Sequence, residues 1–90
     1  MVSGVIRTPR AERYVKQLAG HWREKAEVTV DADGATHFAM GSGASATLRP
    51  QPDVLVVESS TAEFGEVVQR HLERFGMREG LALEWEPEGQ

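Results

Sequence analysis

Hydrophobic and polar residues are arranged along the chain in two helical stripes and several alternating runs. One stripe recurs at the three- and four-residue spacing of an amphipathic helix, through Phe64, Val67, Val68, Leu72 and Phe75. Another follows the same spacing through Ala11, Tyr14, Val15, Leu18 and Trp22. His71 points into the centre of the stripe formed by Phe64 to Phe75, at a position where packing favours leucine. The stripes predict two helices that each bury one face.

Capping residues mark the expected ends of these helices. Thr8 followed by Pro9 predicts a helix start, because a hydroxyl caps the free N–H groups and proline suits the first helical position. Ser60 and Glu63 form the capping box S-x-x-E, which opens the second helix. Gly76 is expected to close that helix as a left-handed C-cap residue.

Alternating apolar and polar residues predict strands over residues 2–8, 26–31, 35–40, 44–49, 54–59 and 81–86. Turn residues separate the middle strands, in the segments "DADG", "GSG" and "PQPD". The order β-α-β-β-β-β-α-β then indicates an antiparallel sheet with one packed face and one wet face. Two helices with one apolar face each need the same sheet face to cover. We therefore expect an α+β fold, a two-layer α/β sandwich with both helices on one face, in a single domain of residues 1–90.

Composition and charge narrow the classes of function. The chain has no cysteine, which excludes disulfides, thiolate metal sites and cysteine nucleophiles. Its formal net charge is −4, although residues 1–25 hold six basic residues against two acidic ones and so carry +4. A negatively charged chain repels phosphates, so nucleic acid is not an expected partner. Apolar runs are short and residues 1–10 lack the apolar core of a secretory signal, so we expect a cytoplasmic protein without a membrane span.

His71 has two competing interpretations. A neutral histidine is tolerated in a core when its N–H finds an acceptor, such as the hydroxyl of Tyr14 or a strand carbonyl. Alternatively, His71 binds a ligand or takes part in catalysis. His21 lies on the flank of the first helix, and side-by-side helices would bring His21 and His71 together across the seam. With Glu24 or Glu73 they would form a zinc or iron(II) set, although Glu73 points away from the stripe and no H-E-x-x-H motif is present.

Two other features have simpler structural explanations. His37 projects with Ala35 and Ala39 from the sheet face assigned to solvent. Residues 41–45, "GSGAS", lack the G-x-x-x-x-G-K-[ST] pattern of a phosphate loop and precede a strand rather than a helix. We expect His37 to be an exposed polar residue and residues 41–45 to form a hairpin turn.

Residues 8–25, "TPRAERYVKQLAGHWREK", and residues 67–79, "VVQRHLERFGMRE", together resemble signature segments of the bacterial domain-of-unknown-function family 2218. The likeness covers nearly the whole chain, including "FAMGSGASATL" in the middle, with a local departure at Ala11-Glu12. It implies a fold similar to the C-terminal domain of phosphohexomutases, which is TATA-binding-protein-like, without mutase chemistry. It also implies an association with siderophore-interacting flavin reductases, and through them with iron handling.

We therefore expect a small non-enzymatic binding or accessory module without a cofactor, for which such a flavin reductase is a candidate partner. The predicted ligand-binding residues lie in the helical layer: His21, His71, Arg13, Tyr14, Lys16 and Arg74. Basic residues around a histidine could receive an anionic ligand such as a carboxylate or catecholate. The alternative is a metal-binding protein or small enzyme that uses His21 and His71. The outer sheet face and the edge strands could also pair two chains into a homodimer.

Overall fold

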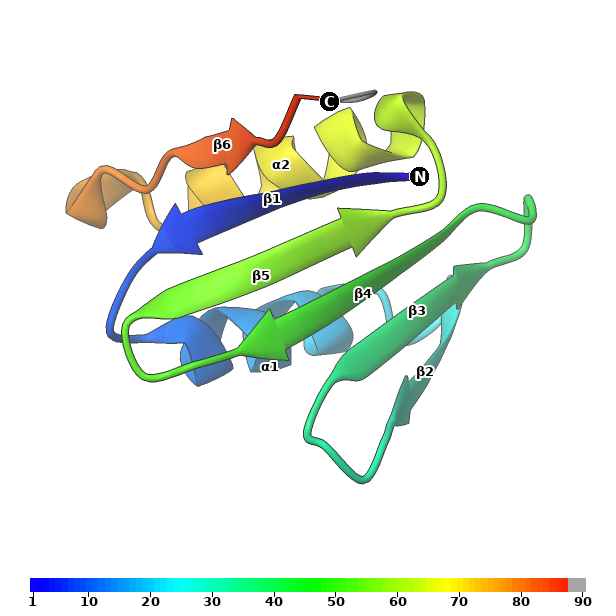
Figure 1. Ribbon diagram of the computed structural model, residues 1–90. Helices are drawn as coiled ribbons and strands as arrows, with labels where there is room; N and C mark the ends of the chain where they lie inside the picture. Colours follow the sequence, from blue (N-terminus) through cyan, green and yellow to red (C-terminus); the bar gives the residue numbers. More distant parts are fainter. Residues whose placement is uncertain (88–90) are drawn as a thin grey trace.

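The computed structural model describes residues 1–87 and contains one six-stranded antiparallel sheet covered by two helices (Figure 1). The strands are β1 (Val2–Arg7), β2 (Ala26–Val30), β3 (Thr36–Met40), β4 (Ser45–Pro50), β5 (Val54–Ser59) and β6 (Leu83–Trp85). The helices are α1 (Ala11–His21) and α2 (Ala62–Phe75), and a short 3-10 helix, η1 (Met77–Glu79), follows α2. Both helices lie behind the sheet in the view of Figure 1 and contact β4 and β5. The predicted α+β fold, element order and shared helical face are confirmed.

β1 is an interior strand of the sheet, although it comes first in the chain. The strand order is β2-β3-β4-β5-β1-β6, and β1 pairs antiparallel with both β5 and β6. α1 carries the chain from β1 to the edge strand β2, and the meander from β2 to β5 then brings it back beside β1. α2 and η1 carry it across to β6 at the other edge. Both helical connections therefore cross the same sheet face, and the start of α1 meets the segment that follows α2.

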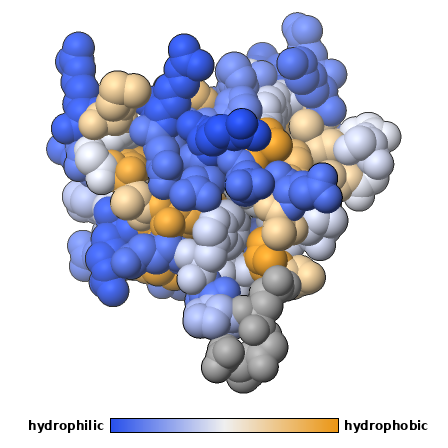
Figure 2. Space-filling view, turned by 90° about the horizontal axis from the view of Figure 1, so that it is seen from above, coloured by the Kyte–Doolittle hydropathy of each residue, from blue (hydrophilic) through white to orange (hydrophobic). Residues whose placement is uncertain are grey.

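The core lies between the sheet and the helical layer. Its fully buried side chains come from both layers: Ile6, Phe38, Leu48, Leu55 and Val57 of the sheet, and Leu18, Val68 and Leu72 of the helices. The outer sheet face is partly exposed. Seen from above, the surface of the molecule is mostly hydrophilic, with hydrophobic residues in small areas between hydrophilic ones (Figure 2). Among residues 1–87, neither helix has the length and apolar character that crossing a membrane requires.

α1 begins later than its capping residues predict. It starts at Ala11, after a turn at Pro9 and Arg10, and Thr8 is not its N-cap. The hydroxyl of Thr8 accepts the N–H of Arg10 at 3.0 Å and donates to the carboxylate of Glu79, also at 3.0 Å. Thr8 therefore fixes the turn before the helix and links it to a distant acidic residue.

α2 also begins one residue later than predicted, with Thr61 in place of Ser60 as the N-cap. The hydroxyl of Thr61 accepts the N–H of Phe64 at 3.1 Å. Ser60 still pairs with the sheet: its N–H donates to the carbonyl of Ser45 at 2.9 Å, and its hydroxyl accepts the N–H of Ser45 at 3.0 Å. These two contacts hold Ser60 beside β4 and leave the capping role to the next hydroxyl.

Gly76 ends α2, but its backbone is not left-handed as predicted, since its φ is −103°. Glycine is required there for space, because an added Cβ would lie 2.2 Å from Cγ of Leu81. The left-handed residue is Gly80, with φ of 71°, which turns the chain toward β6. Leu81 packs under the end of α2, so the last strand covers only Leu83–Trp85 instead of residues 81–86.

Candidate anion-binding groove

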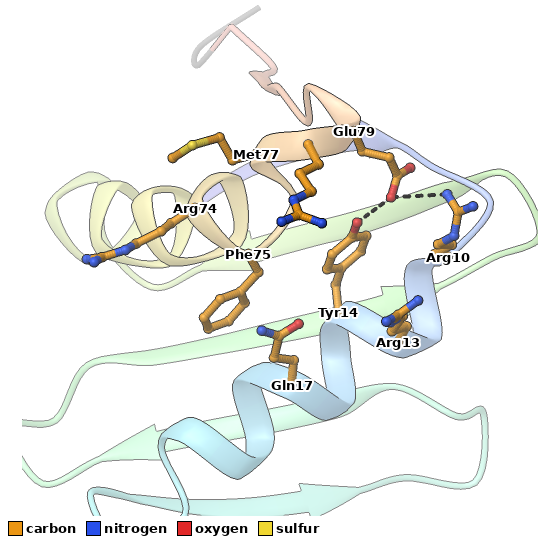
Figure 3. A pocket seen from close by; sticks show the side chains of 10 residues that line it. Arg10, Arg13, Tyr14, Gln17, Arg74, Phe75, Met77 and Glu79 are labelled. Carbon is orange, nitrogen blue, oxygen red and sulfur yellow. Dashed lines mark hydrogen bonds and ion pairs between the residues drawn. The ribbon is translucent and has the colours of Figure 1, made fainter.

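An open groove of about 600 Å³ lies between α1 and the end of α2 with η1 (Figure 3). Its charged lining residues are four arginines and one glutamate: Arg10, Arg13, Arg74, Arg78 and Glu79. Tyr14, Gln17 and Phe75 extend into the space between the helices (Figure 3). The groove is therefore strongly basic, although the chain as a whole has a net charge of −4.

Local structure explains why these charges meet. Arg10, Arg13 and Gln17 follow one another at spacings of three and four residues, so they share one side of α1. Arg74 occupies the last turn of α2, where the partial negative charge of a helix C-terminus favours a cation. Arg78 follows in η1, which lies directly after α2. Basic residues from opposite ends of the helical layer thus line one groove.

Glu79 links the start of α1 to the segment after α2. The Tyr14 hydroxyl donates a hydrogen bond to its Oε1, and the Thr8 hydroxyl donates to its Oε2 at 3.0 Å. Nη1 of Arg10 lies 3.3 Å from Oε1 of Glu79 (Figure 3). The bond from Tyr14, followed by those from Thr8 and Arg10, lowers the pKa of Glu79, and the same bond raises the pKa of Tyr14. The carboxylate therefore stays ionised while the phenol stays neutral.

The other groove arginines have no acidic partner of this kind. Among residues 1–87, the only ion pair within 4.0 Å that involves a groove arginine joins Arg10 to Glu79. Arg13, Arg74 and Arg78 form no such pair with these residues, and all three are exposed. An anion that enters the groove would meet the guanidinium groups of Arg13 and Arg78, which pair with no carboxylate of the described residues, whereas the guanidinium group of Arg74 extends away from the other lining residues (Figure 3).

His21 and His71 lie together beside the groove, as the predicted helix seam requires. Their ring centroids are 5.0 Å apart, and the ring of Phe75, which lines the groove, lies 5.8 Å from His21 and 6.3 Å from His71. His71 does not bond to Tyr14 or to a strand carbonyl, which corrects the prediction. Its Nδ1 donates to the carbonyl of Val67 at 2.7 Å, one turn earlier in α2. A backbone acceptor of its own helix thus accommodates the imidazole in the hydrophobic stripe.

Lys16 lies outside the groove. It lines a separate shallow depression with Arg23, between α1 and β2. Glu73 accepts hydrogen bonds from the side chain of Gln69 and from the N–H of Leu83, so it faces β6 and cannot join the histidines, as expected. In the described part of the chain, no group of three or more histidine, aspartate or glutamate side chains is placed to hold a metal ion.

His37 is more than an exposed polar residue, because it has two side-chain partners on the outer sheet face. Its Nε2 lies 2.8 Å from Oδ2 of Asp31, and its Nδ1 lies 2.9 Å from Oγ1 of Thr47. The bond to His37 is the main cause that lowers the pKa of Asp31. A catalytic triad has the same three group types, but Thr47 lies within a strand whose backbone pairs with both β3 and β5, which is a poor place for an oxyanion site. Ala35, which was expected beside His37 on the exposed face, lies just before β3 and is buried, which corrects that part of the prediction.

Three of the predicted site residues line the groove: Arg13, Tyr14 and Arg74. Four other polar lining residues were not predicted: Arg10, Gln17, Arg78 and Glu79. Each of these four lies inside one of the two family-like segments, residues 8–25 and 67–79, which is the signal that could have identified them.

The fold and the groove together define a small α+β domain with a basic cleft on its helical layer. The chain belongs to the domain-of-unknown-function family 2218, because the profile of that family, described as an uncharacterized protein conserved in bacteria, matches residues 3–86. The solved NMR structure of PA4090 from Pseudomonas aeruginosa is similar to this chain, with 28% identity, 100% of both chains covered and a TM-score of 0.67. No curated protein matches the chain. The family resemblance is confirmed, and the likeness to the phosphohexomutase C-terminal domain stays a prediction.

Proposed function

We propose that this protein is a non-enzymatic binding module that holds a small anion in the groove between α1 and η1. The main support is the pair of exposed guanidinium groups of Arg13 and Arg78, which line the groove and have no carboxylate partner among the described residues. Guanidinium groups bind carboxylates and phosphates through paired, charge-assisted hydrogen bonds. The volume of about 600 Å³ is in the usual range for small-molecule sites.

The distribution of charge favours a small anion over a polyanion. Residues 1–25 carry +4, whereas the whole chain carries −4, so the positive charge is local. A long polyanion that followed the surface beyond the groove would meet the acidic remainder of the chain. A small carboxylate or phosphate that binds in the groove avoids that acidic remainder, and the one carboxylate among the lining residues, that of Glu79, is already paired with Arg10.

The polar groups of the groove favour binding over proton transfer. A general base or acid works best with a pKa near the working pH. The pKa of Glu79 is lowered and that of Tyr14 is raised, so both move away from neutrality. Their mutual hydrogen bond gives them a structural role, which is to hold η1 against the start of α1.

Calorimetric titration with inorganic phosphate and with citrate tests this proposal. Arg13→Gln and Arg78→Gln each remove one guanidinium group and keep a polar side chain. We expect each change to weaken binding about tenfold or more, since a hydrogen bond to a charged group contributes roughly 1.5–3 kcal/mol. Lys16→Gln is the matched control, because it removes one positive charge from the same helix but outside the groove. Its affinity should stay within about twofold of wild type.

Two results would contradict anion binding in the groove. One is a wild-type protein that binds neither phosphate nor citrate. The other is an equal loss of affinity in Lys16→Gln and Arg78→Gln, because overall charge rather than groove geometry would then govern binding.

The family resemblance extends this proposal to a cytoplasmic module that works beside a siderophore-interacting flavin reductase. Pull-down from cells grown with and without iron tests the association with the reductase, with wild-type protein and Arg13→Gln as baits. Enrichment of the reductase by the wild-type bait in an iron-dependent manner would support the association. The same set of captured proteins under both iron conditions would count against it.

A further inference from the structure

We infer that His21 and His71 form a second binding site, which takes one divalent transition-metal ion such as Zn²⁺ or Cu²⁺. The site is separate from the anion-binding function proposed above and does not depend on it. It consists of the two imidazoles at the seam between α1 and α2, whose ring centroids are 5.0 Å apart. Imidazole nitrogen is a favoured ligand for zinc, copper and nickel.

The hydrogen bond of His71 leaves one ring nitrogen free for a metal ion. Nδ1 must be the donor, because its partner at 2.7 Å is the carbonyl oxygen of Val67. The neutral ring then carries its lone pair on Nε2. Histidines that bind metals usually donate their other ring N–H to a carbonyl or a carboxylate, which fixes the tautomer and the orientation of the ring. His71 has this supporting contact already.

The distance between the two rings suits a shared ion. A metal ion about 2.0–2.1 Å from each imidazole nitrogen lies about 3.2 Å from each ring centroid, and two such rings at a tetrahedral angle are about 5.2 Å apart. The observed distance of 5.0 Å is close to this value, and the rings are tilted by 56°. Binding then requires the two side chains to rotate so that one nitrogen of each ring faces the same ion.

The surroundings of the pair indicate an exchangeable ion rather than a structural one. His21 is exposed and gives access from solvent, whereas His71 is half-buried against the ring of Trp22, with centroids 5.1 Å apart. Two imidazoles fill only part of a tetrahedral shell, so water or a small anion completes it. Arg74, one turn further along α2, opposes a cation and so reduces the affinity. Cu²⁺ should bind more tightly than Zn²⁺.

Titration of the tag-free protein with Zn²⁺, followed by calorimetry and by NMR of the histidine rings, tests this site. We expect one ion per chain and shifts of the ring signals of His21 and His71. His21→Ala and His71→Gln should each weaken Zn²⁺ binding about tenfold or more. His37→Ala is the matched control, because His37 lies on the outer sheet face with its own partners, and it should leave the affinity unchanged.

Zn²⁺ binding by His21→Ala with wild-type affinity would overturn the inference. His21 is exposed, so this variant should keep its fold, which circular dichroism verifies, and the test stands even if His71→Gln is unstable. Equal shifts of all three histidines, or no binding by the wild-type protein, would also overturn it, because the paired geometry would then have no special affinity.

Discussion

The contact between Gly76 and Leu81 predicts that one methyl group at the end of α2 destabilises the fold. In Gly76→Ala the new Cβ would lie 2.2 Å from Cγ and 2.3 Å from Cδ1 of Leu81. Carbon atoms pack at about 3.5–4.0 Å, so the side chain of Leu81 has to move by roughly 1.5 Å. Leu81 is only 9% exposed, so this movement disturbs the packing around it.

Two opposing effects set the magnitude of this change. Overpacking of a well-packed site costs about 1–3 kcal/mol. The backbone of Gly76 has a φ of −103°, which alanine adopts readily. Because alanine reduces the conformational entropy of the unfolded chain, it also stabilises the fold by about 0.4–1 kcal/mol. The net loss in the free energy of unfolding should be about 1–2 kcal/mol, which lowers Tm by roughly 5–15 °C in a domain of this size.

Gly20→Ala provides the matched control. It adds the same methyl group to α1, where nothing lies within 4 Å of the new Cβ. Alanine in an exposed helix is about 0.5–1 kcal/mol more favourable than glycine, so this variant should gain stability. Urea unfolding, monitored by tryptophan fluorescence and circular dichroism, measures both variants. A Gly76→Ala protein as stable as wild type, or a shift of both variants in the same direction, would refute the assigned contact.

Tyr14 is the single tyrosine of the chain, so the ultraviolet absorbance of phenolate follows its titration alone, and the midpoint should lie above the ordinary tyrosine pKa because of the bond to Glu79 and burial. Glu79→Gln should lower this midpoint, and an ordinary value in the wild-type protein would contradict the bond. A folded-state pKa that is raised contributes stability below the unfolded-state pKa, and this contribution is lost as the pH rises through the folded-state value. Thr61→Ala should reduce the free energy of unfolding by about 1 kcal/mol through loss of the N-cap, whereas Thr61→Ser should not. A Thr61→Ala protein as stable as wild type would show that the cap is wrongly assigned.

Secondary structure could be predicted from the sequence because burial repeats every helical turn or every second strand residue. The helix boundaries depended on contacts that no local pattern reveals. Thr8 has the chemistry of an N-cap, but its hydroxyl donates to Glu79, which lies 71 positions later. Ser60 has the same chemistry, but its pairing with Ser45 keeps it beside the sheet.

The candidate groove could be predicted only in part. His21 and His71 were expected to meet because both lie on helix faces that point to one seam. The contribution of Arg10 and Glu79 was missed because the start of α1 and η1 come together only when β1 lies between β5 and β6, and the element order alone does not specify this arrangement. Local spacing therefore identifies which residues share a face, while strand order decides which faces meet.

The interior position of β1 also affects how the chain folds during synthesis. Residues 2–7 leave the ribosome well before their hydrogen-bonding partners in β5 and β6 are made. The meander from β2 to β5 can pair locally, whereas the centre of the sheet has to wait for contacts between distant parts of the chain, which slows folding. Until β6 arrives, one side of β1 stays open to pairing with another nascent chain, which offers a route to aggregation during synthesis.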